Sequence, residues 1–204
     1  MKVSTILASA SLAVFGSVLP ASAGLLTNTG FESGSGTTAS GWIQGSGVTR
    51  TSGAAKAPSS FGMDITIGAA QEQRLQQNVA SGLTGGTSYT ATVDVLQPGA
   101  LVGVDAQIWI QWFGTSGFIS NTLTNIAPNA SWQNFTHTAT APAGTTNAEV
   151  FVRLASGAFP EAGGTVYADN FDFLDNSAPA VPEPASIGLL GLAATGLLAR
   201  RRKA

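Results

Sequence analysis

The chain has 204 residues, no cysteine and a formal net charge of −2 at pH 7. Without cysteine it forms no disulfide, so its stability has to come from a packed core, with or without a bound metal. Residues 24–178 carry four basic and ten acidic side chains, a net charge of −6, which argues against nucleic-acid binding because that function needs a basic surface. This segment has the size of one domain.

The N-terminus, residues 1–23, has the pattern of a secretory signal peptide. Lys2 is the only charge before an apolar run from Ile6 to Leu19, and Pro20-Ala-Ser-Ala follows. A basic start, a short apolar core and an Ala-x-Ala site are typical of a cleaved export signal. We therefore expect cleavage after Ala23. The alternative is an N-terminal membrane helix, for which the apolar run is short.

Residues 24–174 are predicted to form one all-β domain, a β-sandwich. Short runs that alternate between apolar and polar residues are separated by turn residues at intervals of about ten positions, which is typical of a sandwich. The expected strands lie near 25–31, 41–49, 61–67, 72–80, 87–97, 104–113, 131–139, 147–154 and 165–173.

The expected strand at 104–113 is the most informative for function. One face carries apolar side chains such as Ile108, and the other carries Asp105, Gln107, Trp109, Gln111 and Phe113. An aromatic ring can stack on the C–H face of a sugar, and neighbouring amides and carboxylates can bind its hydroxyls. The alternative is that Trp109 lies under a loop or under a second layer of the structure. Glu149 and Arg153 share one face of the strand at 147–154 and form either a polar binding surface or a solvated one. Phe151 lies between them on that face and indicates either a second platform or partial cover by a loop.

The C-terminal part of the chain is predicted to direct sorting. After a linker at 175–181 come Pro182-Glu183-Pro184, an uncharged apolar run at 185–199, and four cations, Arg200 to Lys203. As a helix the apolar run would be about 22 Å long, shorter than a hydrocarbon core of about 30 Å. It would span as a transmembrane helix only with help from long basic side chains, with the cations in the cytoplasm.

This order of parts in residues 182–204 resembles the PEP-CTERM sorting signal of Gram-negative bacteria. The resemblance implies recognition by an exosortase, loss of the tail, and export to the envelope or to an extracellular polysaccharide matrix. The alternative is a tail anchor that is never cleaved.

The body resembles β-jelly-roll carbohydrate-binding modules with a galactose-binding-like fold. The likeness is carried by Gly30-Phe-Glu, Gly41-Trp, Gly86-Thr-Ser-Tyr-Thr, Ser131-Trp-Gln-Asn-Phe-Thr and Gly164-Thr-Val-Tyr-Ala-Asp-Asn-Phe. It implies that Trp42 and Trp132 pack in the core. It also implies a structural calcium ion held by Glu32 and Asp169, although these acids could equally be solvated strand-end residues.

No catalytic motif is found in the sequence, and the protein is expected not to be an enzyme. A serine nucleophile elbow, a cysteine nucleophile, zinc-type histidine spacing and a phosphate-binding loop are all missing. The single histidine, His137, is predicted to lie on a strand surface. Because a glycosidase needs only two carboxylates, glycoside hydrolysis remains a less favoured alternative.

The sequence thus predicts an exported β-jelly-roll protein that binds carbohydrate through Asp105, Gln107, Trp109 and Gln111. A structural or adhesive matrix protein without a specific glycan is the second interpretation. The expected partners are a glycan, an exosortase and, before processing, the membrane.

Overall fold

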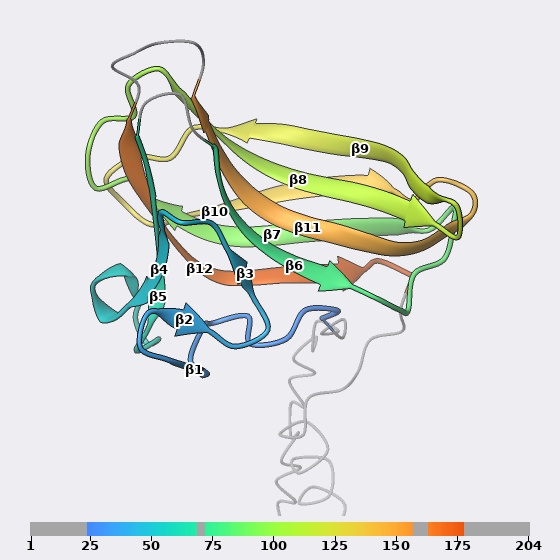
Figure 1. Ribbon diagram of the computed structural model, residues 1–204, viewed down its shortest axis with the longest axis horizontal. Coiled ribbons are helices and arrows are strands. Elements are labelled where there is room, and N and C mark those ends of the chain that lie inside the picture. The colour runs from blue at the N-terminus through green and yellow to red at the C-terminus, as the bar shows by residue number, and fades with distance from the viewer. Residues whose placement is uncertain (1–23, 69–71, 157–162, 178–204) are drawn as a thin grey trace, which may run out of the picture. The chain divides into compact units, whose positions relative to one another are not determined.

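The structure is a computed structural model that describes residues 24–68, 72–156 and 163–177 (Figure 1). A compact unit spans Ser22–Ala178, and its described residues form strands and one short 3₁₀ helix, with no α-helix. Two five-stranded antiparallel sheets form a sandwich, so the all-β, jelly-roll fold class is confirmed.

The first sheet, called the β7 sheet, has the strand order β10-β7-β12-β5-β4, and the second, called the β8 sheet, has the order β3-β6-β11-β8-β9. A two-stranded ribbon, β1 (Gly34–Ser35) with β2 (Thr38–Ala39), precedes them. The other elements are β3 (Ile43–Gln44), β4 (Val48–Thr51), η1 (Ser52–Ala54), β5 (Gly62–Ile67), β6 (Glu72–Val79), β7 (Ser88–Leu96), β8 (Val104–Gly114), β9 (Gly117–Ile126), β10 (Gln133–Thr140), β11 (Thr145–Ser156) and β12 (Gly164–Asp175).

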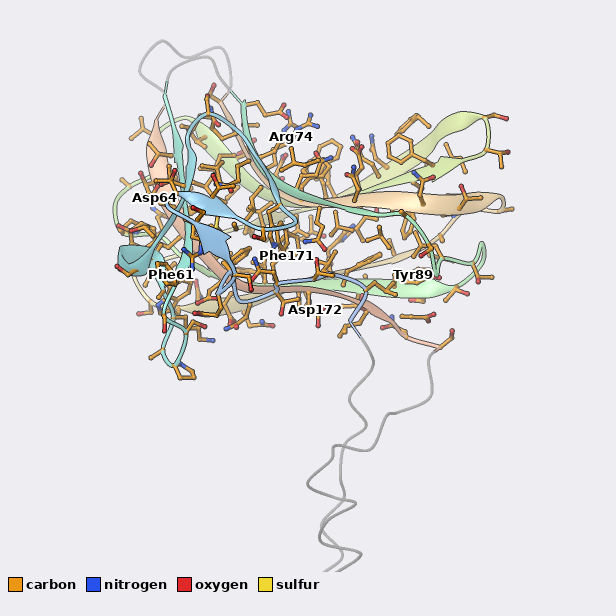
Figure 2. The ribbon with its side chains drawn as sticks, turned by 60° about the horizontal axis from the view of Figure 1, so that its bottom comes forward. Phe61, Asp64, Arg74, Tyr89, Phe171 and Asp172 are labelled. Carbon is orange, nitrogen blue, oxygen red and sulfur yellow. The ribbon has the colours of Figure 1, made fainter. Side chains whose placement is uncertain are left out.

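The core lies between the two sheets and is built from alternate residues of each long strand. In β8 the inward residues Ile108, Ile110 and Trp112 are fully buried, and in β7 the same holds for Tyr89 and Val93. This follows from the pleat, which sends successive side chains to opposite faces. Figure 2 shows Tyr89 and Phe171 between the layers, and Arg74 and Asp172 on opposite outer sides of the sandwich.

The two predictions nearest the N-terminus differ from the structure: the strand at 25–31 is absent, and the strand at 41–49 is divided in two. Residues 25–31 form no strand: Asn28 and Phe31 have left-handed backbone angles (φ 53° and 57°) that interrupt an extended ladder. The segment is held instead by the core, where the buried Phe31 ring lies 5.0 Å from Trp42. The predicted strand 41–49 is divided into β3 and β4 around Gly47, whose missing Cβ would lie 2.1 Å from the Thr66 carbonyl oxygen.

The other seven predicted strands are confirmed to within two residues at each end, but alternation missed β9. The inward residues of β9 include Ser120, Thr122 and Thr124, which pair with core-facing positions of β8. Hydroxyl residues in core-facing positions leave no apolar period to recognise.

The prediction for His137 is also wrong. Its side chain is 8% exposed and points between the sheets, not to the surface. It hydrogen-bonds to Thr124 and Thr122 of β9. These core-facing hydroxyl residues, which made β9 hard to predict from alternation, are therefore the hydrogen-bond partners of the imidazole. Trp42 is buried as expected, whereas Trp132 is only half-buried.

The signal peptide (1–23), most of the linker and the sorting segment (182–204) with its apolar run lie outside the described residues. Within the described ranges, no helix has the length and apolar character needed to cross a membrane.

Candidate functional site

The four residues predicted to bind sugar all lie on the outer side of β8. Asp105, Gln107, Trp109 and Gln111 alternate with the buried residues of the same strand, so the structure brings them onto one face. Their exposure differs: Asp105 is exposed, Trp109 and Gln111 are half-buried, and Gln107 is 9% exposed.

Strand register places further residues beside Trp109. Phe151 of β11 lies opposite it on one side and Leu123 of β9 on the other. The Trp109 and Phe151 rings are nearly parallel, with centroids 5.7 Å apart. Phe151 is fully buried although it belongs to the outer face, because its neighbours on this face cover it.

Two arginines lie over these rings. The Arg153 guanidinium is 5.0 Å from the Trp109 ring centroid, and that of Arg74 is 4.8 Å from the Phe151 centroid. Both arginines pair with Glu72, with Arg153 donating a hydrogen bond at 2.6 Å. Burial raises the pKa of Glu72, but the hydrogen bonds and charges of the two arginines outweigh this and hold the pKa below its usual value.

A hydrogen-bond chain fixes the middle of the face. The indole Nε1 of Trp109 donates to Gln107 Oε1 at 2.8 Å, and Gln107 Nε2 donates to Asn125 Oδ1 of β9 at 2.9 Å. Aromatic contacts and hydrogen bonds therefore hold Trp109 in one orientation before any ligand arrives.

We call this surface the β8 outer face: Glu72, Arg74, Asp105, Gln107, Trp109, Gln111, Asn121, Leu123, Asn125, Phe151 and Arg153. Sequence reasoning missed Glu72, Arg74 and the three β9 residues. The sequence did contain a signal for β9, because a period of two is present in the alternation of hydroxyl residues with Asn121, Leu123 and Asn125.

The two residues predicted to hold calcium lie at one loop between η1 and β5. Glu32 Oε1 accepts hydrogen bonds from the backbone N–H groups of Ser60 (2.7 Å) and Phe61 (3.2 Å). Asp169 Oδ2 accepts from the N–H of Lys56 at 2.8 Å. The structure therefore brings Asp169 of β12 and Glu32 of the N-terminal segment to the same loop.

Burial raises the pKa of Asp169, which is fully buried. Backbone N–H groups and Ser59 act in the opposite direction, and the negative charge of Glu32 raises the pKa further. A buried carboxylate close to a second negative charge is an environment that a cation would stabilise.

The backbone around these acids is also strained. Asn28, Phe31 and Asn170 are the three non-glycine residues with left-handed backbone angles among those described, and such residues often cluster at functional sites. The number of side chains that could bind a metal here is nonetheless small, because the described ranges contain no group of three or more His, Cys, Asp or Glu side chains that could hold a metal ion. Since calcium takes six to eight oxygen ligands, carbonyl groups or water would have to complete the shell.

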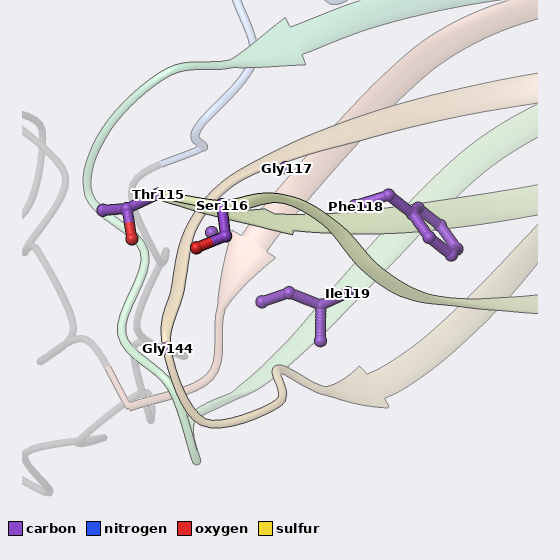
Figure 3. Close-up of a pocket in the computed structure, with 7 residues that line it drawn as sticks. Thr115, Ser116, Gly117, Phe118, Ile119 and Gly144 are labelled. Atoms are coloured by element: carbon purple, nitrogen blue, oxygen red, sulfur yellow. The ribbon is translucent and has the colours of Figure 1, made fainter.

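A pocket of about 230 Å³ lies at the turn between β8 and β9 (Figure 3). Its lining is Gly114, Thr115, Ser116, Gly117, Phe118, Ile119 and Gly144. None of these side chains titrates, so this pocket offers no acid–base pair for hydrolysis.

In comparisons with known proteins, the C-terminal segment and the sandwich match different groups of proteins. Residues 180–203 match the PEP-CTERM protein-sorting motif, which confirms the resemblance over a range that includes Pro182, Glu183 and Pro184. The motif implies export and exosortase-dependent sorting in the cell envelope. Among the curated proteins, none matches this chain.

Several solved structures share the fold at low sequence identity. The module TmCBM61 in complex with β-1,4-galactotriose has a TM-score of 0.56 at 16% identity, over 76% of this chain and 100% of its own. The CBM22-1 xylan-binding domain of Xyn10C from Paenibacillus barcinonensis has a TM-score of 0.55 at 16% identity, over 79% and 99%.

Part of an enzyme also shares the fold. The enzymatically active domain of bacteriophage CBA120 tailspike protein 4 has a TM-score of 0.58 at 12% identity over 74% of this chain, which spans only 21% of that domain. The chain therefore joins a jelly-roll sandwich, with the fold of carbohydrate-binding modules, to a C-terminal PEP-CTERM sorting motif.

Proposed function

We propose that this chain is an exported, non-catalytic protein that binds a glycan on the β8 outer face. The observation that carries the proposal is the arrangement around Trp109: an oriented indole with amides on neighbouring strands. Gln111, Asn121 and Asn125 offer donors and acceptors for sugar hydroxyls, and the aromatic edge and Leu123 offer apolar contact for sugar C–H groups. Two proteins of similar fold carry names that mention a bound galactotriose or xylan binding.

A structural or adhesive role in an extracellular polysaccharide matrix, without a specific glycan, is the second candidate. One observation favours it: one face of the Trp109 ring already packs against Phe151, which leaves less of the indole for a sugar. Hydrolysis has less support, because the similar enzyme is about five times longer than the aligned part and the pocket at the β8–β9 turn has no carboxylate.

The experiment compares glycan binding by Trp109→Ala with that of the unchanged domain. The segment 24–178 contains both sheets and the core in one compact unit, so it is expected to fold by itself. Its retention in gels containing galactan, xylan or other polysaccharides is measured by affinity electrophoresis. Trp109→Ala should weaken binding by about tenfold or more, equivalent to at least about 1.4 kcal/mol.

Trp132→Ala is the matched control, because Trp132 is another half-buried tryptophan but precedes β10 in the opposite sheet. It should bind as the unchanged domain does. Equal binding by both variants would exclude the β8 outer face, and no retention of the unchanged domain by any polysaccharide would favour the structural role.

We also propose that Glu32 and Asp169 hold a structural calcium ion, which would tie the N-terminal segment to β12 and stabilise the fold by mass action. Calcium should raise the melting temperature of the 24–178 segment, and a chelator should reverse the shift. Glu32→Gln should abolish this shift in melting temperature because it removes the negative charge that attracts calcium. The amide oxygen of the new glutamine can still accept hydrogen bonds from the backbone N–H groups of Ser60 and Phe61. An unchanged melting temperature with and without calcium would contradict this proposal.

A further inference from the structure

One flank of the sandwich is free of charged residues. The sequence has no Asp, Glu, Lys or Arg from residue 106 to residue 148, and this stretch forms most of β8 and all of β9 and β10. β9 is the edge strand of the β8 sheet and β10 that of the β7 sheet. Both edges meet on the same flank, where His137 of β10 hydrogen-bonds to β9.

Of the edge strands on the two sheets, β9 is the longest. It has 10 residues and hydrogen-bonds to β8 alone, so its outer N–H and C=O groups have no strand partner among the described elements. The opposite edges are formed by β3 with 2 residues and β4 with 4. Natural edge strands are commonly protected by being short, or by lysine, proline or a bulge. β9 has neither lysine nor proline, and its one bulge lies at its beginning, near Phe118.

Apolar side chains concentrate on this edge strand. Phe118, Ile119 and Leu123 are 58%, 37% and 39% exposed, and they are three of the five exposed large hydrophobic residues in the described ranges. Figure 3 shows Phe118 and Ile119 at the start of β9, beside the turn. β10, the other long edge, has no such residue in that set. Exposed apolar surface next to open backbone groups is typical of a protein interface.

We propose that β9 pairs antiparallel with β9 of a second copy of this chain, around a two-fold axis perpendicular to the sheet. An uncharged strand meets its own copy without like-charge repulsion, and a two-fold contact closes after two subunits. The rest of the body carries its net negative charge outside this flank. Repulsion between two copies is therefore smaller on this flank than on the rest of the body, and of its two edges β9 is the one that carries exposed apolar side chains.

Pairing of this kind would extend the β8 sheet across both copies into one ten-stranded sheet. Leu123, Asn121 and Asn125 of each copy would lie near the joint, with Trp109 one strand further in. The two β8 outer faces would then form a continuous surface. If the proposed glycan site is correct, a long polymer could contact both copies, which increases the overall affinity without a new contact. The pairing itself does not depend on glycan binding.

The experiment measures self-association of the 24–178 segment by sedimentation equilibrium in the absence of glycan. The unchanged segment should form dimers as its concentration rises. Leu123→Lys and Asn121→Asp each add two like charges close to the joint, one from each copy, which destabilises strand pairing. Each should raise the dimer dissociation constant by tenfold or more, with an unchanged circular dichroism spectrum.

Two matched variants test the location. Ile43→Lys replaces another exposed apolar residue on the opposite edge of the same sheet, and Thr138→Lys places a charge on β10. Both should dimerise like the unchanged segment. A monomer at all concentrations would overturn the proposal. Loss of the dimer in Thr138→Lys but not in Leu123→Lys would also overturn it, because that result assigns the contact to β10.

Discussion

At the scale of single residues, the imidazole of His137 links the edges of the two sheets. Its Nδ1 lies 2.8 Å from the Thr124 hydroxyl and its Nε2 lies 3.0 Å from that of Thr122. Burial lowers the pKa of His137, and only a hydrogen bond with Thr122 acts in the other direction. A buried imidazole whose two nitrogens are both engaged is therefore neutral at pH 7 and contributes to packing at the flank.

This pKa shift predicts a pH dependence of stability. Because the folded-state pKa is lower than that of the unfolded chain, about 6.5, the unfolded chain binds more protons between the two values. The contribution to stability is complete above about pH 6.5 and is lost as the pH falls toward the folded-state pKa, by at most about 1.4 kcal/mol per pH unit. Urea unfolding at pH 7.5 and pH 5 measures this loss, and His137→Gln should reduce it. An equal loss in His137→Gln would assign it to other groups.

The pKa of Asp94 is lowered as well, but for this carboxyl group the shift favours the charged form. Burial raises its pKa, but hydrogen bonds from Lys56, Asn170 and Asn134 and the charge of Lys56 outweigh this and lower it. The Lys56 Nζ lies 2.8 Å from Asp94 Oδ2. The folded state therefore holds the ionised form, and this contribution to stability is present above the unfolded pKa of about 3.9 and is lost as the pH falls further.

Asp94→Asn should destabilise the domain at neutral pH by about 1 to 3 kcal/mol, because it removes the anion that Lys56 and two asparagines contact. The difference between this variant and the unchanged domain should shrink below about pH 4, where Asp94 of the unchanged protein becomes protonated. Chemical denaturation at both pH values measures this. A difference that does not depend on pH would show that the ion pair is not its cause.

At the scale of elements, aromatic rings fix β7 against the rest of the sandwich. Tyr89 is fully buried at the start of β7, and its ring lies 5.4 Å from Phe173 of β12 and 5.8 Å from Trp112 of β8. Its hydroxyl oxygen accepts a hydrogen bond from the backbone N–H of Thr84 at 2.7 Å. One side chain thus joins both sheets and the loop that leads into its own strand.

Tyr89→Phe should lower the free energy of unfolding by about 1 kcal/mol, because the Thr84 N–H loses its acceptor while the ring contacts remain. Thr84→Ala is the control: it keeps the backbone N–H and should leave stability nearly unchanged. Guanidinium unfolding measures both variants. A Tyr89→Phe protein as stable as the unchanged one would show that solvent replaces this hydrogen bond fully.

At the scale of the whole molecule, function depends on two parts with different physical roles. The sandwich presents the β8 outer face, and the sorting motif at 180–203 directs the chain to the envelope. Glu183 is the one acid after residue 178, and the four terminal cations follow the uncharged run. A cluster of arginine and lysine of this kind favours the cytoplasmic side of a membrane.

Replacing Pro182, Glu183 and Pro184 together by alanine should block processing in a bacterium that has an exosortase. The unchanged chain should be converted to a shorter form that is released from the membrane fraction, while the variant should remain at full length. Immunoblots of fractionated cells measure this. Arg153→Gln, a change in the sandwich, is the control and should be processed normally. Equal processing of all three proteins would show that the motif is not needed.

How much of the site could be predicted depended on where its residues lie in the chain. Asp105, Gln107, Trp109 and Gln111 belong to one strand, so the pleat alone puts them on one face. Phe151 and Arg74 reach the same face only through register between β8, β11 and β6, which no local pattern encodes. β9 was missed because the core-facing Thr122 and Thr124 bind His137 and so take the place of apolar residues.

The sequence by itself determined the C-terminal sorting motif, the class of the fold and the faces of the long strands, because a motif, composition and a period of two are local properties. Only the tertiary structure decided which strands are neighbours, that Phe151 is buried against Trp109, that Glu32 and Asp169 meet at one loop, and that a charge-free stretch becomes an open edge. These depend on contacts between residues far apart in the chain, which exist only after the two sheets have packed.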